Sequence, residues 1–362
     1  MGRERIVIID GNSLINRAYY AIQRPMITKE GLYTHAVYGF LTMLNKIRTD
    51  YQPQYLAVAF DRKAPTFRHL EYDAYKAGRK KMPPELAMQL PLLKEVLSAM
   101  NIEMLEIDGF EADDIIGTVA RRGEEEGLAP LIITGDRDAL QLATDTTTVL
   151  LTKKGISEFE LYDRQAMIDK YGFRPEQFID FKGLMGDPSD NIPGLPGVGE
   201  KTAQKLILQF GSVAELIRRT DEISSARLRE KVEENAELAV MSRRLATIVT
   251  EVPIDVDLEA CRVKEADGER LVECYRKLEF NSFLKKLSKE NSAEPEVKKA
   301  EAAVAIEVKQ RPLVLLKDAA QVEELKSEIE AEGLLLIKTF GDDNHRATPV
   351  LEGMTLQTAE HS

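Results

Sequence analysis

Three short apolar runs that each end in an aspartate constrain the fold most strongly. They are IVIID (6–10), YLAVAFD (55–61) and LIITGD (131–136). Such runs, separated by helical patterns, are typical of the strands of an α/β sheet. Because the carboxyl ends of parallel strands meet at one crevice, we expect Asp10, Asp61 and Asp136 to lie close together.

Two further strands, IEMLEI (102–107) and TTVLL (147–151), complete the predicted sheet, and DDIIGTVARRGEEEG from Asp113 predicts a helix. Beyond about residue 174 helical periods dominate, as in KTAQKLILQF and NAELAVMSRRLATIV. We therefore expect an α/β class with a mostly parallel central sheet flanked by helices, over residues 1–173. A helical subdomain is expected to follow over residues 174–287.

The remainder of the chain has a different composition. Residues 288–303, SKENSAEPEVKKAEAA, are charged and poor in large apolar side chains, which indicates a linker. Residues 304–362 show a strand–helix–strand pattern that is short for a domain, so we expect an incomplete domain there. We expect this segment to be protease-sensitive in isolation.

Composition excludes some classes of protein. No apolar run approaches the roughly 18 residues of a membrane span, so no membrane partner is expected. Cys261 and Cys274 match no zinc or redox spacing, which favours a cytoplasmic location. The net charge of −12 taken alone argues against nucleic acid, because DNA binding relies on basic side chains. That argument fails if the acids form a metal site and the bases are grouped elsewhere.

Six further acids accompany those at the strand ends: Glu111, Asp113, Asp114, Asp138, Asp187 and Asp190. Nine carboxylates in one pocket would repel each other unless cations neutralised them. All-oxygen sites suit Mg²⁺, for which Mn²⁺ can substitute. Two such ions, roughly 4 Å apart, would activate a water molecule and stabilise the leaving oxygen of a phosphodiester.

Each acid also has a simpler interpretation. A single aspartate after a strand more often caps a helix or forms a turn, and Asp113 or Asp114 would cap the helix that begins beside it. The occurrence of nine acids at the ends of successive elements weakens that interpretation for the set as a whole.

A basic stretch follows Asp61. Between residues 62 and 81 there are seven basic side chains and two interleaved tyrosines: Arg62, Lys63, Arg68, Lys76, Arg79, Lys80, Lys81, Tyr72 and Tyr75. Such a segment can bind a phosphate backbone and stack an unpaired base. A solvated surface loop is the alternative.

The stretch GDPSDNIPGLPGVGEKTA (186–203) places a glycine-rich turn directly after two acids. Glycines allow backbone N–H groups to approach a phosphate, and the following helix start favours an anion. Lys201 and Lys205 add positive charge. This is a helix–hairpin–helix pattern for binding DNA independently of sequence, although a turn of this kind also occurs for structural reasons alone.

Seven motifs together resemble the 5′-nuclease (5′→3′ exonuclease) domain of bacterial DNA polymerase I, a relative of the flap endonucleases. They are VIIDGNSLINRAYYA, FDRKAPTFRH, YKAGR, GFEADDIIG, ITGDRDALQL, GLMGDPSDNIPGLPGVGEKTA and FNSFLKKL, within residues 4–288. The resemblance implies a PIN-like nuclease fold and the removal of 5′ flaps and RNA primers in replication and repair. Its expected partners are branched, flapped and RNA-primed DNA, and a monomer is expected.

The resemblance also implies residue roles. One metal ion would be surrounded by Asp10, Asp61, Glu111, Asp113 and Asp114, and the second by Asp136, Asp138, Asp187 and Asp190. A helical arch near residues 62–90 would admit the 5′ strand, with Tyr75, Lys76 and Arg79 as catalytic residues. The expected DNA-binding residues are Arg68, Lys80, Lys81, Gly194, Gly197, Val198, Gly199, Lys201, Thr202 and Lys205. A K⁺ ion is expected near the hairpin.

The C-terminal segment resembles the start of a proofreading-like domain. Lys338 and Phe340 occupy the positions at which a 3′–5′ exonuclease carries two acids, so we expect a degenerate domain. The chain stops at Ser362, so the polymerase domain that normally shares the chain is expected to be absent. Two alternatives remain: a small RNA-processing nuclease of the acidic α/β type, which would lack YKAGR and GLPGVGEKTA, and a catalytically inactive structure-selective DNA-binding module.

Overall fold

The computed structural model describes residues 3–153, 155, 158–292, 335–342 and 350–358. The chain forms two compact units, residues 1–294 and 295–362. The second unit contains strands β7 (Leu335–Asp342) and β8 (Val350–Thr358), which pair antiparallel. β7 agrees with the strand expected around Lys338 and Phe340. The strand and helix expected before it lie outside the described residues.

The first unit is built on a six-stranded sheet of order β3-β2-β1-β4-β5-β6. The strands are β1 (Arg5–Asp10), β2 (Tyr55–Ala59), β3 (Glu103–Leu105), β4 (Ala129–Thr134), β5 (Thr148–Thr152) and β6 (Phe159–Tyr162). The first five run parallel, and each was predicted from sequence. The antiparallel edge strand β6 was not, because four residues give too short a pattern to identify.

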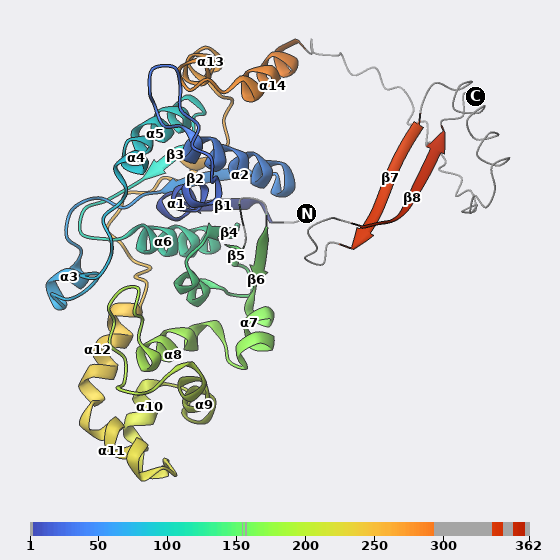
Figure 1. Ribbon diagram of the computed structural model, residues 1–362. Helices are drawn as coiled ribbons and strands as arrows, with labels where there is room; N and C mark the ends of the chain where they lie inside the picture. The colour runs from blue at the N-terminus through green and yellow to red at the C-terminus, as the bar shows by residue number, and fades with distance from the viewer. Residues whose placement is uncertain (1–2, 154, 156–157, 293–334, 343–349, 359–362) are drawn as a thin grey trace, which may run out of the picture. The chain divides into compact units, whose positions relative to one another are not determined.

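Helices cover both faces of this sheet (Figure 1), and a hydrophobic core lies against each face. Along β1 the buried side chains alternate, so that Ile6 and Ile8 contribute to the core on the side of α6 (Ala112–Glu125). Val7 and Ile9 contribute to the opposite core. That core is closed by helices α1 (Gly11–Ala21), α2 (His35–Tyr51), α5 (Gln89–Ala99), α13 (Gly268–Lys277) and α14 (Asn281–Ser292).

The order of the strands determines where a site can form. β1 lies between β2 and β4: the chain passes from β1 to β2 and β3 on one side and then crosses to β4 on the other. Ligands bind beyond the carboxyl ends of strands at such a switch point. Asp10 ends β1 there and caps α1, since its Oδ1 accepts a hydrogen bond from the Ser13 N–H at 2.8 Å.

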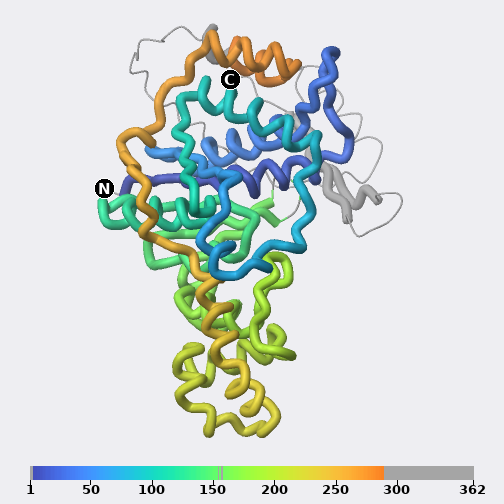
Figure 2. The backbone as a smooth tube through the Cα atoms, turned by 90° about the vertical axis from the view of Figure 1, so that its left-hand side faces the viewer, coloured from blue at the N-terminus to red at the C-terminus, as the bar shows by residue number. Residues whose placement is uncertain are grey.

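The segment predicted as a helical arch is mostly turns. Within residues 62–90 the structure has α3 (Phe67–Glu71), α4 (Pro84–Ala87) and the first two residues of α5. Lys76 adopts a left-handed backbone with φ 55°, and the Pro83–Pro84 pair removes two N–H donors, so no helix runs through residues 72–83. Figure 2 shows the segment as a light-blue loop reaching the junction between the sheet and the helical part. The expectation of a helical arch is therefore wrong for this conformation.

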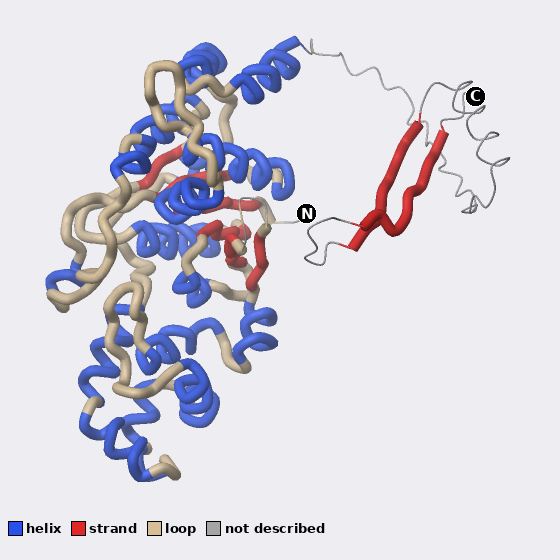
Figure 3. The backbone as a smooth tube through the Cα atoms, viewed as in Figure 1, coloured by secondary structure: helices blue, strands red, loops and turns tan. Residues whose placement is uncertain are grey.

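From α7 onward the first unit is helical, and Figure 3 shows no strand between α7 and α12. The helices are α7 (Arg164–Tyr171), α8 (Phe178–Met185), α9 (Glu200–Phe210), α10 (Val213–Arg218), α11 (Ala226–Glu234) and α12 (Ala236–Ala246). The described residues of the first unit also contain four 3₁₀ turns: η1 (Arg137–Leu142), η2 (Pro175–Gln177), η3 (Thr220–Glu222) and η4 (Leu258–Cys261).

Two sequence expectations about boundaries need correction. The predicted helix NAELAVMSRRLATIV ends at Ala246, because the backbone that follows is held by side chains of other elements. The predicted linker begins too early, since α14 continues to Ser292. Residues 293–303 of that linker lie outside the described residues. Within the described part of the chain, no helix is both long and apolar enough to cross a membrane.

Candidate active site

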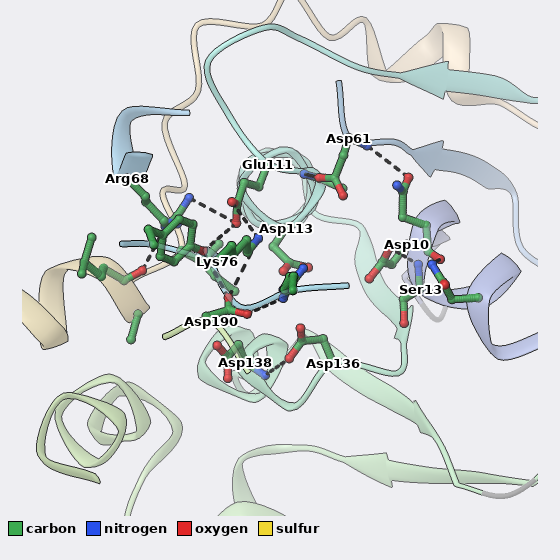
Figure 4. A pocket seen from close by; sticks show the side chains of 18 of the residues that line it. Asp10, Ser13, Asp61, Arg68, Lys76, Glu111, Asp113, Asp136, Asp138 and Asp190 are labelled. Atoms are coloured by element: carbon green, nitrogen blue, oxygen red, sulfur yellow. Dashed lines mark hydrogen bonds and ion pairs between the residues drawn. The ribbon is translucent and has the colours of Figure 1, made fainter. Parts of the chain in front are cut away.

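A cavity of about 510 Å³ lies beyond the carboxyl ends of β1 and β4, beside the start of α6 (Figure 4). The predicted acids that line it are Asp10, Asp61, Glu111, Asp113, Asp136, Asp138 and Asp190. These side chains come from five separate stretches of sequence, so the fold brings them together as predicted. Asp114 and Asp187 do not line the cavity.

Four of the lining acids are not neutralised by a basic side chain. Among the ion pairs of the described residues, none involves Asp10, Asp61, Asp113 or Asp136. Burial raises the pKa of Asp10 to about 7, and the charges of Asp61 and Asp136 add to the effect. Burial and the charge of Asp10 likewise raise the pKa of Asp113 well above its usual range. A cation bound in this corner of the cavity would therefore stabilise the ionised carboxylates.

The acids on the other side of the cavity are paired with the segment that follows α3. Lys76 Nζ donates to Glu111 Oε1 at 2.7 Å, and Arg79 forms an ion pair with Asp190. The buried Tyr75 hydroxyl lies 3.1 Å from Glu111 Oε2 and 3.2 Å from Asp190 Oδ2. Burial and then the charge of Glu111 raise the pKa of Tyr75, so the phenol stays protonated and donates.

Backbone contacts hold this segment in place as well. The Lys76 N–H donates to the Asp190 carbonyl at 2.9 Å, and Asn191 Nδ2 donates to the Ala74 carbonyl at 2.7 Å. The three residues predicted as catalytic, Tyr75, Lys76 and Arg79, are thus directed into the cavity by the same loop that carries Asp190. Lys80 also lines the cavity, whereas Lys81 does not.

Lys182 is a site residue that sequence reasoning missed. It lies on α8, is only 8% exposed, and its Nζ is 2.7 Å from Asp138 Oδ1 and in an ion pair with Asp187. Burial alone would raise the pKa of Asp187, but the contact with Lys182 lowers it. For Asp138, burial and the charge of Asp136 outweigh Lys182 and raise the pKa to about 7.

The donor set fits divalent cations. Among the described residues no three acidic, histidine or cysteine side chains are arranged to hold an ion in this conformation. Lys76, Arg79 and Lys182 pair with four of the acids in this conformation: Glu111, Asp190, Asp138 and Asp187. The remaining donors, Asp10, Asp61, Asp113 and Asp136, are carboxylate oxygens, which are the ligands that hard divalent ions prefer.

Two predicted roles are contradicted by the geometry. Asp114 is fully buried, and its two oxygens accept hydrogen bonds from Arg68, from the Glu111 N–H and from the Val249 N–H. No lone pair direction is left for a metal ion. Arg68 is 2% exposed and also donates to the carbonyls of Leu245 and Thr247. It lines the cavity, but protein groups engage its guanidinium, so in this conformation it has a structural role and is not available to a DNA strand.

In the glycine turn between α8 and α9, two of the residues predicted to bind DNA have structural roles instead. The Gly194 N–H donates to Ser242 Oγ at 3.0 Å, and the N–H of the buried Val198 donates to the Leu195 carbonyl at 3.0 Å. Neither is free to bind a phosphate, so these two predictions are wrong. A Cβ at Gly194 would lie 2.4 Å from the Gly186 nitrogen, which explains the glycine structurally.

The other predicted residues of this turn are available. Gly197, Gly199, Lys201 and Lys205 are exposed and Thr202 is half-buried; the first N–H groups of α9 have no acceptor within the helix. Lys231 Nζ donates to the Pro196 carbonyl at 3.0 Å. A cationic side chain therefore already lies at the turn near which K⁺ was expected.

The first turns of α1 contribute three residues to the cavity that were not predicted from the sequence. Asn12, Ser13 and Asn16 line the cavity, and Asn12 Oδ1 accepts from the Asp61 N–H at 3.2 Å. Polar residues at positions 12 and 16, four apart and directly after Asp10, are the signal that would have indicated a helix face turned toward the acids.

The chain is similar in sequence to bacterial DNA polymerase I proteins. The chain is 47% identical over 295 residues to DNA polymerase I of Bacillus subtilis (strain 168), covering 81% of this chain and 33% of that protein. It is 43% identical over 347 residues to DNA polymerase I of Geobacillus stearothermophilus, covering 95% and 38%. The chain thus spans about a third of the length of the curated relatives it matches.

Solved structures share the fold. The bacteriophage T5 5′-exonuclease with bound zinc has a TM-score of 0.58 at 20% identity, covering 79% of this chain and 98% of that one. The catalytic core of Rad2 in complex with DNA substrate has a TM-score of 0.52 at 17% identity, covering 79% and 93%. The model of the 5′-3′ exonuclease N-terminal resolvase-like domain matches residues 5–172, and that of the 5′-3′ exonuclease C-terminal SAM fold matches residues 173–269. The chain therefore belongs to the 5′-3′ exonuclease family.

Proposed function

We propose that this chain is a metal-dependent 5′→3′ exonuclease and structure-specific 5′-flap endonuclease that removes flaps and RNA primers in replication and repair. One observation carries the proposal: four carboxylates without a basic partner and the basic side chains of Lys76 and Arg79 line the same cavity. The four are Asp10, Asp61, Asp113 and Asp136. Family membership and the relatives named DNA polymerase I support the same reaction.

The acids and the basic residues of the cavity would have different roles in the reaction. A divalent cation bound by the acids would supply the charge that activates water and stabilises the leaving oxygen. Lys76 and Arg79 now neutralise Glu111 and Asp190, and the same side chains have the charge and geometry to bind the scissile phosphate. The Tyr75 hydroxyl keeps Glu111 and Asp190 oriented toward each other.

The turn before α9 would bind the duplex part of the substrate. Exposed Gly197 and Gly199 allow a phosphate to approach the helix start, where the helix dipole favours an anion. Lys201 and Lys205 lie four residues apart on α9 and add positive charge. These contacts address the backbone, so recognition depends on shape and not on base sequence.

We further propose two Mg²⁺ ions, with Mn²⁺ as a substitute, as the physiological cofactors. Divalent ions bound to the T5 5′-exonuclease support a divalent requirement, and the oxygen-only donor set favours Mg²⁺. A K⁺ ion at the hairpin would have to displace Lys231 from Pro196 or bind beside it.

We propose that the protein acts as a monomer in the cytoplasm on branched, flapped and RNA-primed DNA, without a membrane partner. We also propose that residues 304–362 lack 3′–5′ exonuclease activity, since Lys338 and Phe340 on β7 take the expected acid positions.

The test compares substrates of one sequence and different shape in Mg²⁺: a 5′-flapped duplex, an RNA-primed nicked duplex, a blunt duplex and a free single strand. The proposal predicts cleavage near the junction of the first two and little cleavage of the others. Binding to the flap without cleavage in Mg²⁺ or Mn²⁺ would instead support an inactive DNA-binding module.

A further inference from the structure

The backbone of residues 245–249, the crossing segment, is held by side chains from three other elements. It comprises the last two residues of α12 and the three residues after them, and Leu245, Ala246 and Ile248 line the cavity. On one side Arg68 of α3 donates to the carbonyls of Leu245 and Thr247 at 2.9 and 2.7 Å. A buried backbone without strand partners needs such side-chain partners for its polar groups.

Gln141 holds the crossing segment from the other side. It lies on η1, three residues after Asp138, and is 9% exposed. Its Nε2 donates to the Asp138 carbonyl and to the Ala246 carbonyl, each at 3.0 Å. Its Oε1 accepts from the Ile248 N–H at 2.8 Å. Both amide hydrogens and the carbonyl oxygen of Gln141 are thus engaged.

The crossing segment also reaches the first group of acids. The Val249 N–H donates to Asp114 Oδ1 at 2.8 Å, while Asp114 Oδ2 accepts from the Glu111 N–H at 3.0 Å. Buried and partly buried hydrogen bonds, joined through the backbone of Ile248 and Val249, therefore connect the backbone of Glu111 with the backbone of Asp138. At the start of α12's last turn, Ser242 accepts from the Gly194 N–H, so the glycine turn is joined to the same element.

We propose that Gln141 is a positioning residue that fixes the Asp138 backbone relative to Glu111 through the crossing segment. It thereby sets the spacing between the two groups of metal-binding acids. The inference rests on the proposed function, because it assumes that both groups bind divalent ions. Residues that orient ligands from behind typically change metal affinity by about 10–100-fold when they are replaced.

The test is Gln141→Met, which preserves side-chain volume and removes all three hydrogen bonds. The control is Gln209→Met, the same change on the exposed face of α9. Mn²⁺ binding is measured by titration calorimetry without DNA, and affinity for a flapped duplex is measured in EDTA. We expect Gln141→Met to weaken at least one Mn²⁺ by about 10–100-fold while duplex affinity and the control stay unchanged.

Mn²⁺ affinities of Gln141→Met within about twofold of the wild type would overturn the inference, because second-layer replacements should exceed that. If Gln141→Met does not fold, Gln141→Glu takes its place. The ionised glutamate still accepts from the Ile248 N–H but cannot donate to the Asp138 or Ala246 carbonyl, so the same loss of Mn²⁺ affinity is expected at a pH where it is ionised. Mn²⁺ affinity equal to that of the wild type would overturn the inference. Failure of the proposed function is separate: the wild type itself would then neither bind Mn²⁺ nor cut DNA.

Discussion

At the scale of single residues, Tyr75 shows how one hydroxyl can connect acids from two distant stretches of the chain. It is 3% exposed and hydrogen-bonds to both Glu111 and Asp190. Tyr75→Phe should lower the free energy of unfolding of the metal-free protein by about 1–3 kcal/mol, since the bonds go to charged groups. Urea denaturation in EDTA measures this. The half-buried Tyr72→Phe is the control and should change stability by less than about 0.5 kcal/mol.

Arg68 neutralises the buried carboxylate of Asp114. Arg68→Met should cost about 3–5 kcal/mol of stability, because Asp114 would be left charged and buried without its partner. The pKa of Arg68 points the same way: burial would lower it, but the hydrogen bond and charge of Asp114 hold it above the usual value. Denaturant unfolding tests the stability loss. A variant of wild-type stability with weakened DNA binding would restore the DNA-contact role.

The same residues show the limit of sequence reasoning. Acids at strand ends were predictable because strand direction and sheet topology place them at one edge. The pairing of Asp114 with Arg68, or of Lys182 with Asp138, was not predictable, because partners 46 and 44 residues apart carry no local signal. Asp113 and Asp114 look alike in sequence, and only the helix phase sends one into the cavity and the other into the core.

At the scale of elements, α9 has a measurable electrostatic role. Lys201→Ala with Lys205→Ala should weaken binding to a flapped duplex and reduce the slope of log K against log salt by about 2, or roughly 0.9 per lost phosphate contact. Fluorescence anisotropy across a salt series measures the slope. Lys285→Ala with Lys286→Ala removes the same charge from exposed positions of α14 and should leave the slope unchanged.

Elements with strong periodicity were the predictable ones. The five parallel strands, α6 and α9 follow from apolar patterns and helix-start signals. The segment after α3 was predicted as helical arch by resemblance, yet its structure depends on contacts with Asp190 and Asn191 from far along the chain. Those contacts stabilise turns over residues 72–83, where Gly78, Pro83 and Pro84 disfavour a helix.

For the molecule as a whole, the acidic cavity links stability to pH and metal. In the unfolded chain Asp10 and Asp138 ionise near pH 4, whereas in the folded protein their pKa values are about 7. The folded state then binds more protons between these values, so stability in EDTA should fall as the pH rises through them. Divalent ions bind the ionised form, so Mg²⁺ should raise Tm more at pH 7.5 than at pH 5.0, by about a few degrees. Equal shifts at both pH values, measured by calorimetry, would contradict this.

The central claim is that the acids of the cavity bind divalent ions and thereby cut DNA. The most direct measurement is cleavage of a 5′-labelled flap duplex in Mg²⁺, in EDTA, and in Mg²⁺ with Asp136→Ala. Our account predicts cutting near the junction by the wild type in Mg²⁺ only, and its loss both in EDTA and in the variant. Equal cutting by Asp136→Ala and the wild type would contradict the claim, as would tight flap binding with no cutting under any condition.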